Sequence, residues 1–179
     1  QSIIVFAGCT DSPETMTHQA RTLVASLKSQ EFAGTLRFLD IQSTGTLADL
    51  AQARADLAII ALPPQDVTAA LEIAGRIACR AALIVSSGIS AAQASALAKI
   101  AKREGILLLG PNCLGVQRPA LQLNASAAGP LAQRGPLALV SQSGALTASM
   151  LDWAANNAVG FSSVVSLGPH TSIDIAHVL

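Results

Sequence analysis

The sequence predicts an α/β fold in which a doubly wound parallel sheet is followed by the start of a second α/β domain. Five apolar runs, at residues 2–8, 35–41, 56–62, 81–85 and 106–109, alternate with segments that have helical spacing. The first and last of these runs are continuous, which is typical of strands covered on both faces. Strands and helices that alternate in this order form a parallel sheet with crossover helices.

The composition limits the classes of partner. Hydrophobic residues make up 51% of the chain and charged residues 12%, and eleven basic residues balance eleven acidic ones. A net charge of zero excludes the electrostatic footprint of a nucleic-acid or anionic-membrane protein. No apolar run approaches the ~20 residues that cross a bilayer. So few charges indicate that another domain or subunit covers part of the surface, a second copy of the chain included.

The cysteines and the two ends of the sequence predict a cytoplasmic fragment of a longer protein. Cys9, Cys79 and Cys113 are scattered and match no metal-ligand spacing, so we predict no metal site and a reducing compartment. The chain opens directly into a strand pattern, without a signal peptide. It begins without Met and ends within a helical pattern.

The first strand, 2–8, ends at Gly8 and leads through Thr10, Asp11 and Ser12 into a helix predicted to run to about residue 30. Asp11 or Ser12 is the expected N-cap, with proline in the first turn. Such a loop presents backbone N–H groups to an anion, although the glycine pattern of dinucleotide sites is absent. An ordinary strand–helix turn explains it equally well.

The next strand ends are also candidate ligand contacts. The strand at 35–41 precedes a short predicted helix over 47–54. The strand at 56–62 stops at Pro63 and Pro64, a stiff apolar edge that suits stacking on a flat ring or simply ends the strand. A helix to about residue 79 follows. After the strand at 81–85, the small tip of Ser86, Ser87 and Gly88 suits close approach of a ligand or forms a capped turn before a helix to residue 103.

The strand at 106–109 delivers Asn112 and Cys113 to its carboxyl end. Ligands of open α/β sheets bind beyond the carboxyl ends of the strands, so this tip is either part of a site or a plain Gly-Pro turn. Residues 119–134 lack periodicity and are predicted to be a linker. We therefore divide the chain into a first domain, 1–118, and the start of a second, 135–179.

The second domain opens with a strand at 137–141, a helix at 145–157 and a strand at 162–167. Between the first two, Ser143 and Gly144 form a helix N-terminus that suits a phosphate. A nucleophile is the weakest reading, because residue 141 is Ser where the nucleophile-elbow pattern requires Gly. A simple N-cap is the remaining alternative.

Taken together, the loop motifs resemble a known family. They are Leu-Pro-Pro at 62–64, Ser-Ser-Gly at 86–88, Gly-Pro-Asn-Cys-Leu-Gly-Val at 110–116, Val-Ser-Gln-Ser-Gly-Ala-Leu at 140–146, Leu-Asp-Trp-Ala at 151–154, Val-Gly-Phe-Ser at 159–162 and Val-Ser-Leu-Gly at 165–168. This order resembles the CoA-binding region of NDP-forming acyl-CoA synthetases, relatives of the succinyl-CoA synthetase α subunit. Residues 136–179 are especially similar to bacterial proteins in which that region is fused to a GNAT lysine acetyltransferase. The resemblance implies a Rossmann-like first domain and a flavodoxin-like second domain.

The resemblance also implies a CoA or acyl-CoA site on the strand tips. The loop with Gly8, Thr10, Asp11 and Ser12 would face the CoA phosphates, and Pro63 and Pro64 the adenine. Ser86, Ser87 and Gly88 would contact the nucleotide, and Asn112 and Cys113 would lie toward the thiol. Ser143 and Gly144 would receive phosphate from a phosphohistidine, which is expected beyond Leu179. Catalytic residues, ATP or ADP, and Mg²⁺ would come with domains outside this chain.

The function implied is that of a CoA-binding portion of a larger protein. Complete relatives convert acid, CoA and NTP to acyl-CoA, NDP and phosphate with an ATP-grasp domain. Beside a GNAT domain the same region would be regulatory. Two other readings stay open on the residues alone: an NAD(P)-dependent oxidoreductase, disfavoured by the missing glycine pattern, and a degenerate structural domain.

Overall fold

A computed structural model of the chain describes residues 2–9, 12–41, 54–169 and 173. Its first sheet has five parallel strands in the order β2-β1-β3-β4-β5. These are β1 (Ser2–Phe6), β2 (Thr35–Leu39), β3 (Leu57–Ile60), β4 (Ala81–Ile84) and β5 (Leu107–Leu109). All five lie within the predicted runs, and the doubly wound parallel sheet is confirmed.

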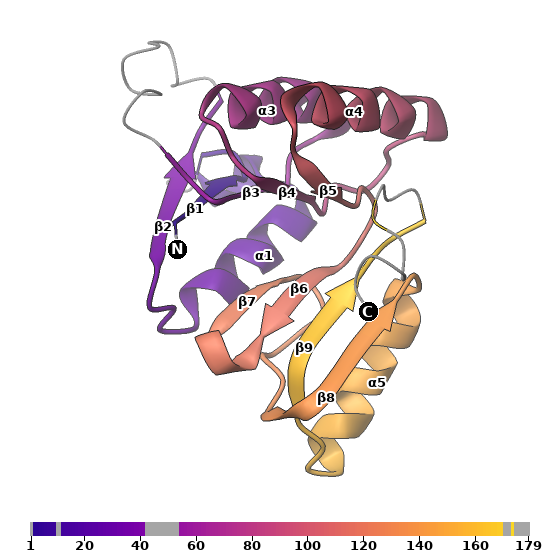
Figure 1. Cartoon of the computed structure of the whole chain (residues 1–179). Helices are drawn as coiled ribbons and strands as arrows, with labels where there is room; N and C mark the ends of the chain where they lie inside the picture. The colour runs from indigo at the N-terminus through magenta and orange to yellow at the C-terminus, as the bar shows by residue number, and fades with distance from the viewer. Residues whose placement is uncertain (1, 10–11, 42–53, 170–172, 174–179) are drawn as a thin grey trace.

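Helices cover both faces of this sheet, and its strands β3, β4 and β5 contain only apolar residues. α3 (Pro64–Arg76) and α4 (Ala91–Glu104) lie on one face, and α1 (His18–Lys28) lies on the other (Figure 1). Two separate cores result. One joins Ile4, Phe6 and Ile60 to α3 and α4, and the other joins Val5 and Ile59 to α1.

The helix after β1 begins later than predicted. Ser12 and its neighbours form a 3-10 turn, η1 (Pro13–Thr15), in which the N–H of Thr15 donates to the carbonyl of Ser12 at 3.0 Å. α1 then starts after Thr17, whose hydroxyl accepts from the N–H of Ala20 at 3.1 Å. The predicted Ser12 cap is therefore wrong, because a second capping residue follows five positions later.

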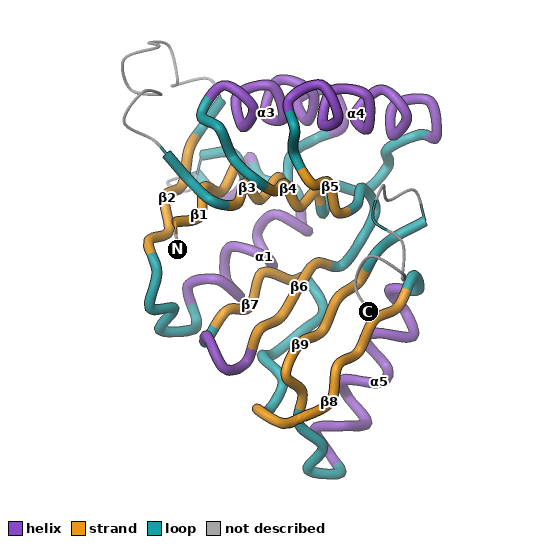
Figure 2. The backbone as a smooth tube through the Cα atoms, viewed as in Figure 1, coloured by secondary structure: helices purple, strands orange, loops and turns teal. Residues whose placement is uncertain are grey.

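The second sheet is mixed and has the order β7-β6-β9-β8. Its strands are β6 (Gly115–Arg118), β7 (Leu123–Ser126), β8 (Arg134–Ser141) and β9 (Phe161–Ser166). β8 and β9 are parallel and are connected by α5 (Gly144–Asn156), as predicted, whereas β6 runs antiparallel to both of its neighbours (Figure 2).

Residues 119–134 are more ordered than the predicted linker. They contain the 3-10 turn η2 (Pro119–Leu121) and strand β7. Leu123 and Ala125 of β7 are buried in the same core as Leu23 and Leu27 of α1. β6, which the prediction gave to the first domain, pairs with β9 of the second. The division at 118 and 135 stays a prediction, but the segment between them is not an irregular tether.

Two predicted elements lie wholly or mainly outside the described residues. These are the short helix over 47–54, of which only Arg54 is described, and the helical pattern at the end of the sequence. Within the described ranges, no helix combines the length and the apolar character needed to span a bilayer.

Candidate functional site

A cavity of about 370 Å³ opens at the carboxyl ends of β1, β2 and β3. The chain leaves β1 for β2 on one side and later returns to place β3 on the other, so the cavity lies where the strand order reverses. Crevices at this switch point are where open α/β sheets bind their ligands. The lining residues are Gly8, Cys9, Ser12, Thr15, Asp40, Ile41, Leu62, Pro63 and Asp66.

The lining combines an apolar wall with carboxylates. Ile41, Leu62 and Pro63 provide surface for a flat ring, while the carboxylates of Asp40 and Asp66 could accept hydrogen bonds from amino or hydroxyl groups of a ligand. No Lys or Arg is among these described lining residues. The chemistry therefore fits the adenosine end of a nucleotide-containing cofactor better than its phosphates, which would depend on backbone N–H groups.

The structure brings three predicted site residues into this cavity: Gly8, Ser12 and Pro63. Gly8 has φ +84°, a conformation that glycine adopts without strain. The predicted contacts Thr10 and Asp11 lie outside the described residues.

Pro64, Ser87 and Gly88 lie next to the cavity rather than in its lining. Pro64 is the first residue of α3, and a Cβ on Gly88 would lie 3.6 Å from its Cγ. The tips of β3 and β4 are therefore neighbours. Ser87 is exposed beside them, so a ligand that extends from the cavity over Pro64 would reach it.

Ser86 and Asn112 use their side chains to hold the strand tips together. Ser86 is buried, and its hydroxyl accepts from the N–H of Leu62 at 2.9 Å. The Asn112 amide accepts from the N–H of Ile89 at 3.3 Å and donates to the carbonyl of Ile89 at 2.9 Å. These residues position the site, and neither lines the cavity.

Cys113 is a core residue. It is 3% exposed, and its Sγ donates to the carbonyl of Ile84 at 3.4 Å. Burial raises the pKa of its thiol to about 12, so the reactive thiolate is not formed near neutral pH. Cys113 therefore does not have the properties of a nucleophile, and its predicted place near the CoA thiol stays a prediction.

Ser143 is the N-cap of α5. Its hydroxyl accepts from the N–H of Leu146 at 3.2 Å, and its own N–H donates to the hydroxyl of Ser141 at 3.1 Å. Of the N–H groups proposed for a phosphate, that of Ser143 is therefore already bonded. Gly144 and Ala145, at the first two helical positions, have no partner within the helix for their N–H groups.

Two glycines lie where the predicted CoA site and the predicted phosphate site at the start of α5 come close together. A Cβ on Gly144 would lie 3.1 Å from Cγ of Leu114, and one on Gly168 would lie 2.7 Å from the carbonyl oxygen of Pro111. Both contacts need glycine or a local shift. The loop after β5 and the N-terminus of α5 are thus adjacent, as a shared ligand would require.

Sequence reasoning missed most of the cavity lining: Cys9, Thr15, Asp40, Ile41, Leu62 and Asp66. Position in the sequence could have identified two of these residues, because Asp40 directly follows β2 and Asp66 lies in the first turn of α3. Within the described ranges, no group of three or more His, Cys, Asp or Glu could hold a metal ion.

Two known protein families match the chain, one in each part. The CoA binding domain family matches residues 13–119, and the succinyl-CoA ligase like flavodoxin domain matches residues 134–179. The first match covers more than half of the chain and contains most of the cavity lining.

Related proteins are ADP-forming ligases. The chain is 38% identical over 125 residues to acetate–CoA ligase [ADP-forming] I of Archaeoglobus fulgidus, covering 66% of this chain and 18% of that protein. It is 35% identical over 130 residues to the acetate–CoA ligase [ADP-forming] I subunit alpha of Pyrococcus furiosus, covering 69% of this chain and 28% of that subunit. The chain thus spans less than a third of the length of these relatives.

Solved structures show the same fold. Acetyl-coenzyme A synthetase 1 of Ca. Korarchaeum cryptofilum, in complex with phosphate and ADP, superposes with a TM-score of 0.85 at 23% identity, covering 99% of this chain and 40% of that one. ATP citrate lyase of Methanothrix soehngenii, in complex with citrate and coenzyme A, gives 0.71 at 15% identity, covering 98% of this chain and 33% of that one. Because the CoA binding domain family matches more than half of the chain, the chain belongs to that family, and its residues 134–179 match the succinyl-CoA ligase like flavodoxin domain.

Proposed function

We propose that this chain is the CoA-binding part of an NDP-forming acid–CoA ligase. In the complete protein, an ATP-grasp domain outside this chain would supply the nucleotide and Mg²⁺ chemistry, and acid, CoA and NTP would give acyl-CoA, NDP and phosphate. The observation that carries the proposal is the cavity at the β1/β3 switch point in a chain of the CoA-binding family.

The lining of the cavity supports an orientation for CoA. The adenine would lie against Ile41, Leu62 and Pro63, with its amino group toward a carboxylate of the cavity. The rest of the molecule would pass over Pro64 and Gly88 toward the loop after β5. That direction ends near Gly144, so the thiol and a phosphate on α5 would lie close together.

Bound CoA would supply the thiol that accepts the acyl group. This chain's own contribution would be positioning, because the residues around Gly144 offer N–H groups and the positive end of the α5 dipole to a phosphoryl oxygen. Ser143 would keep those N–H groups in place as the cap.

A regulatory role beside a GNAT acetyltransferase domain, and the cytoplasmic location, remain narrower proposals. The first rests on the similarity of residues 136–179 to such fusions, and the second on the unpaired cysteines. The sequence of the complete reading frame would show which domains accompany this chain.

The cavity contains its own chemical probe, because Cys9 lines it and is half-buried. We expect saturating acetyl-CoA, which has no free thiol, to slow alkylation of Cys9 by N-ethylmaleimide about tenfold or more. Mass spectrometry of the digested protein measures the labelling at each cysteine. Cys79 and Cys113 are internal controls, since both are buried and should react slowly with or without ligand.

Calorimetry separates absence of binding from binding elsewhere. Heat on addition of CoA with unchanged labelling of Cys9 would contradict the proposed cavity but keep a CoA site. No heat at millimolar CoA and no protection of Cys9 would favour the degenerate structural domain. Protection by NAD(H) in place of acetyl-CoA would favour the oxidoreductase.

A further inference from the structure

Another cavity lies at the opposite edge of the first sheet, where the strands begin. It has a volume of about 710 Å³ and is lined by Ser2, Arg54, Ala55, Asp56, Arg76, Ile77, Ala78 and Arg80. A second cavity, of about 500 Å³, shares Ser2, Asp56 and Arg80 with it and extends past Leu107 to Arg118. We call the two together the amino-edge groove.

The amino-edge groove is strongly basic in a chain without net charge. Four of the eight arginines of the sequence line it, namely Arg54, Arg76, Arg80 and Arg118, against the single carboxylate of Asp56. That carboxylate accepts from the N–H of Ser2 at 3.0 Å. Within the described part of the chain, Arg103 pairs with the carboxylates of Glu72 and Glu104, whereas none of the four groove arginines forms an ion pair.

Helix stability explains only one of these arginines. Arg76 lies in the last turn of α3, where a cation interacts favourably with the helix dipole. Arg54 and Arg80 flank β3 and β4 in loops, and Arg118 ends β6, so no helix dipole acts on them. All four side chains are exposed.

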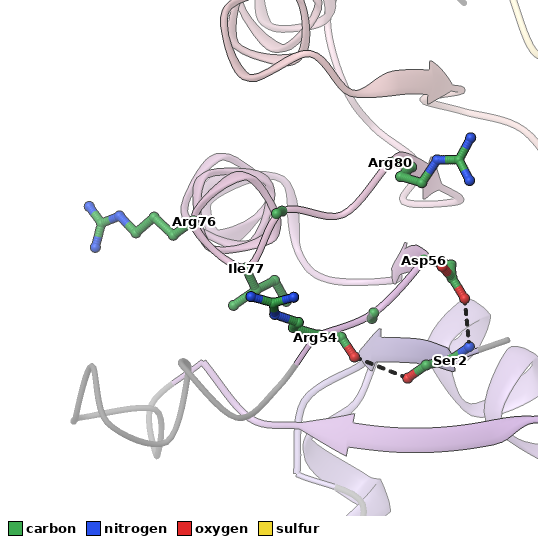
Figure 3. Close-up of a pocket in the computed structure, with 8 residues that line it drawn as sticks. Ser2, Arg54, Asp56, Arg76, Ile77 and Arg80 are labelled. Carbon is green, nitrogen blue, oxygen red and sulfur yellow. Dashed lines mark hydrogen bonds between the residues drawn. The ribbon is translucent and has the colours of Figure 1, made fainter.

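The guanidinium groups are spread along the groove instead of meeting at one point. Arg76 and Arg80 point away from one another, and in this view Arg54 overlaps Ile77, which lines the same cavity (Figure 3). Pockets for small anions focus their polar groups on one ligand, whereas separated charges match separated charges on a partner surface.

An apolar contact point lies within the same groove. Leu107, at the start of the edge strand β5, is 66% exposed, more than any other large hydrophobic side chain among the described residues. Protein interfaces combine such an apolar centre with a charged rim.

From these observations we propose that the amino-edge groove is a docking surface for an acidic segment of a partner protein. Its carboxylates would pair with Arg54, Arg80 and Arg118, and an apolar side chain would cover Leu107. This surface lies across the sheet from the proposed CoA cavity, so both can be occupied at once.

The test measures binding of a labelled oligoglutamate peptide of about ten residues by fluorescence anisotropy. Replacing two arginines together (Arg54→Ser with Arg80→Ser) is expected to weaken binding about tenfold. The matched control removes two exposed charges of α4 (Lys99→Ser with Lys102→Ser) and is expected to change it less than about twofold. Equal losses in the two double variants would overturn the proposal, because binding would then follow net charge alone.

Leu107 gives a second readout that charge does not affect. A peptide with one central leucine is expected to bind several times more tightly than oligoglutamate, and Leu107→Ser to abolish that gain. The same gain in the Leu107→Ser variant would contradict an apolar contact there. Thermal melting of each variant verifies that it folds, and Arg54→Lys with Arg80→Lys, which keeps the charges, should retain most of the affinity.

Two further measurements exclude other occupants. Inorganic tripolyphosphate that binds more tightly than the peptide would show a small-anion pocket and overturn the proposal. Self-association of the wild type in sedimentation velocity, lost in the Arg54→Ser, Arg80→Ser variant, would show that a second copy fills the groove and would overturn it as well.

Discussion

At Gly110 the surrounding backbone leaves no room for a side chain. Its φ is +85°, and a Cβ there would lie 2.2 Å from the carbonyl oxygen of Ile84. We expect Gly110→Ala to lower the free energy of unfolding by about 3–5 kcal/mol, measured by urea denaturation. Gly105→Ala is the control, because Gly105 has φ +69° but nothing within 4 Å of the Cβ position, and it should cost about 1–2 kcal/mol. An equal loss of unfolding free energy in the two variants would mean that the backbone at the β5 tip adjusts readily to a side chain.

The two buried thiols predict a loss of stability at high pH. Burial raises the pKa of Cys113 from 9.0 to about 12, and burial, with Asp56 as the smaller cause, raises that of Cys79 from 9.0 to about 11. Above pH 9 the unfolded chain therefore binds fewer protons than the folded one, and the free energy of unfolding falls as pH rises.

We expect this fall to reach about 1–3 kcal/mol at pH 10 in urea titrations. The chain has no tyrosine, so that source of titration in this range is absent. A variant with Cys79→Ala and Cys113→Ala should lose most of the pH dependence, whereas Cys9→Ser should keep it. The same slope in both variants would assign the effect to other groups.

Among the elements, the β6–β7 hairpin departs most from prediction. On the face opposite Leu123 and Ala125, the hairpin carries polar side chains, Gln117, Asn124 and Ser126, all at most 1% exposed. They form a network in which the Gln117 amide donates to the Ser126 hydroxyl at 3.1 Å and accepts from the N–H of Ala132 at 3.0 Å. Asn and Gln are mostly exposed in proteins, so nothing in the sequence indicated that these strands are buried. The nearby prolines and glycine indicated a loop instead.

This network predicts a cost for an apolar residue of similar size. Gln117→Leu would leave the N–H of Ala132 and the carbonyl of Pro130 without their side-chain partner. We expect a loss of about 2–4 kcal/mol in urea unfolding and faster proteolysis of residues 127–133. Gln142→Leu, at an exposed position, should have little effect. Similar losses for both would show that the network contributes little.

Strands β1, β3 and β4 of the first sheet were predictable because burial on both faces leaves uninterrupted apolar runs, as in Leu57–Ile60. The start of α1 was not, because Ser12 and Thr17 carry equally good capping signals and only the fold selects Thr17. For the candidate site, the sequence indicated each strand tip separately as a possible ligand contact. That Gly8 and Pro63 share a cavity with Asp40 follows from the strand order, which depends on contacts far apart in the chain.

At the scale of the whole molecule, the two sheets share a core. β7 packs on α1. Leu123 and Ala125 thereby cover the part of the α1 side of the first sheet that α1 itself does not cover. We expect a chain shortened to residues 1–118 to unfold at a lower urea concentration than the full chain and to bind the dye ANS, which reports exposed apolar surface. Equal midpoints without dye binding would support a first domain that folds independently within the predicted boundary.

Leu114 lies at the junction of the two sheets. Its N–H donates to the hydroxyl of Ser166, its carbonyl accepts from the N–H of Ala127, and its side chain supports Gly144 at the start of α5. Three elements are thus fastened to one residue that directly follows the β5 tip. We expect a displacement of that tip to shift β9 and the start of α5 as well, so that an event at the first sheet would be transmitted to the second.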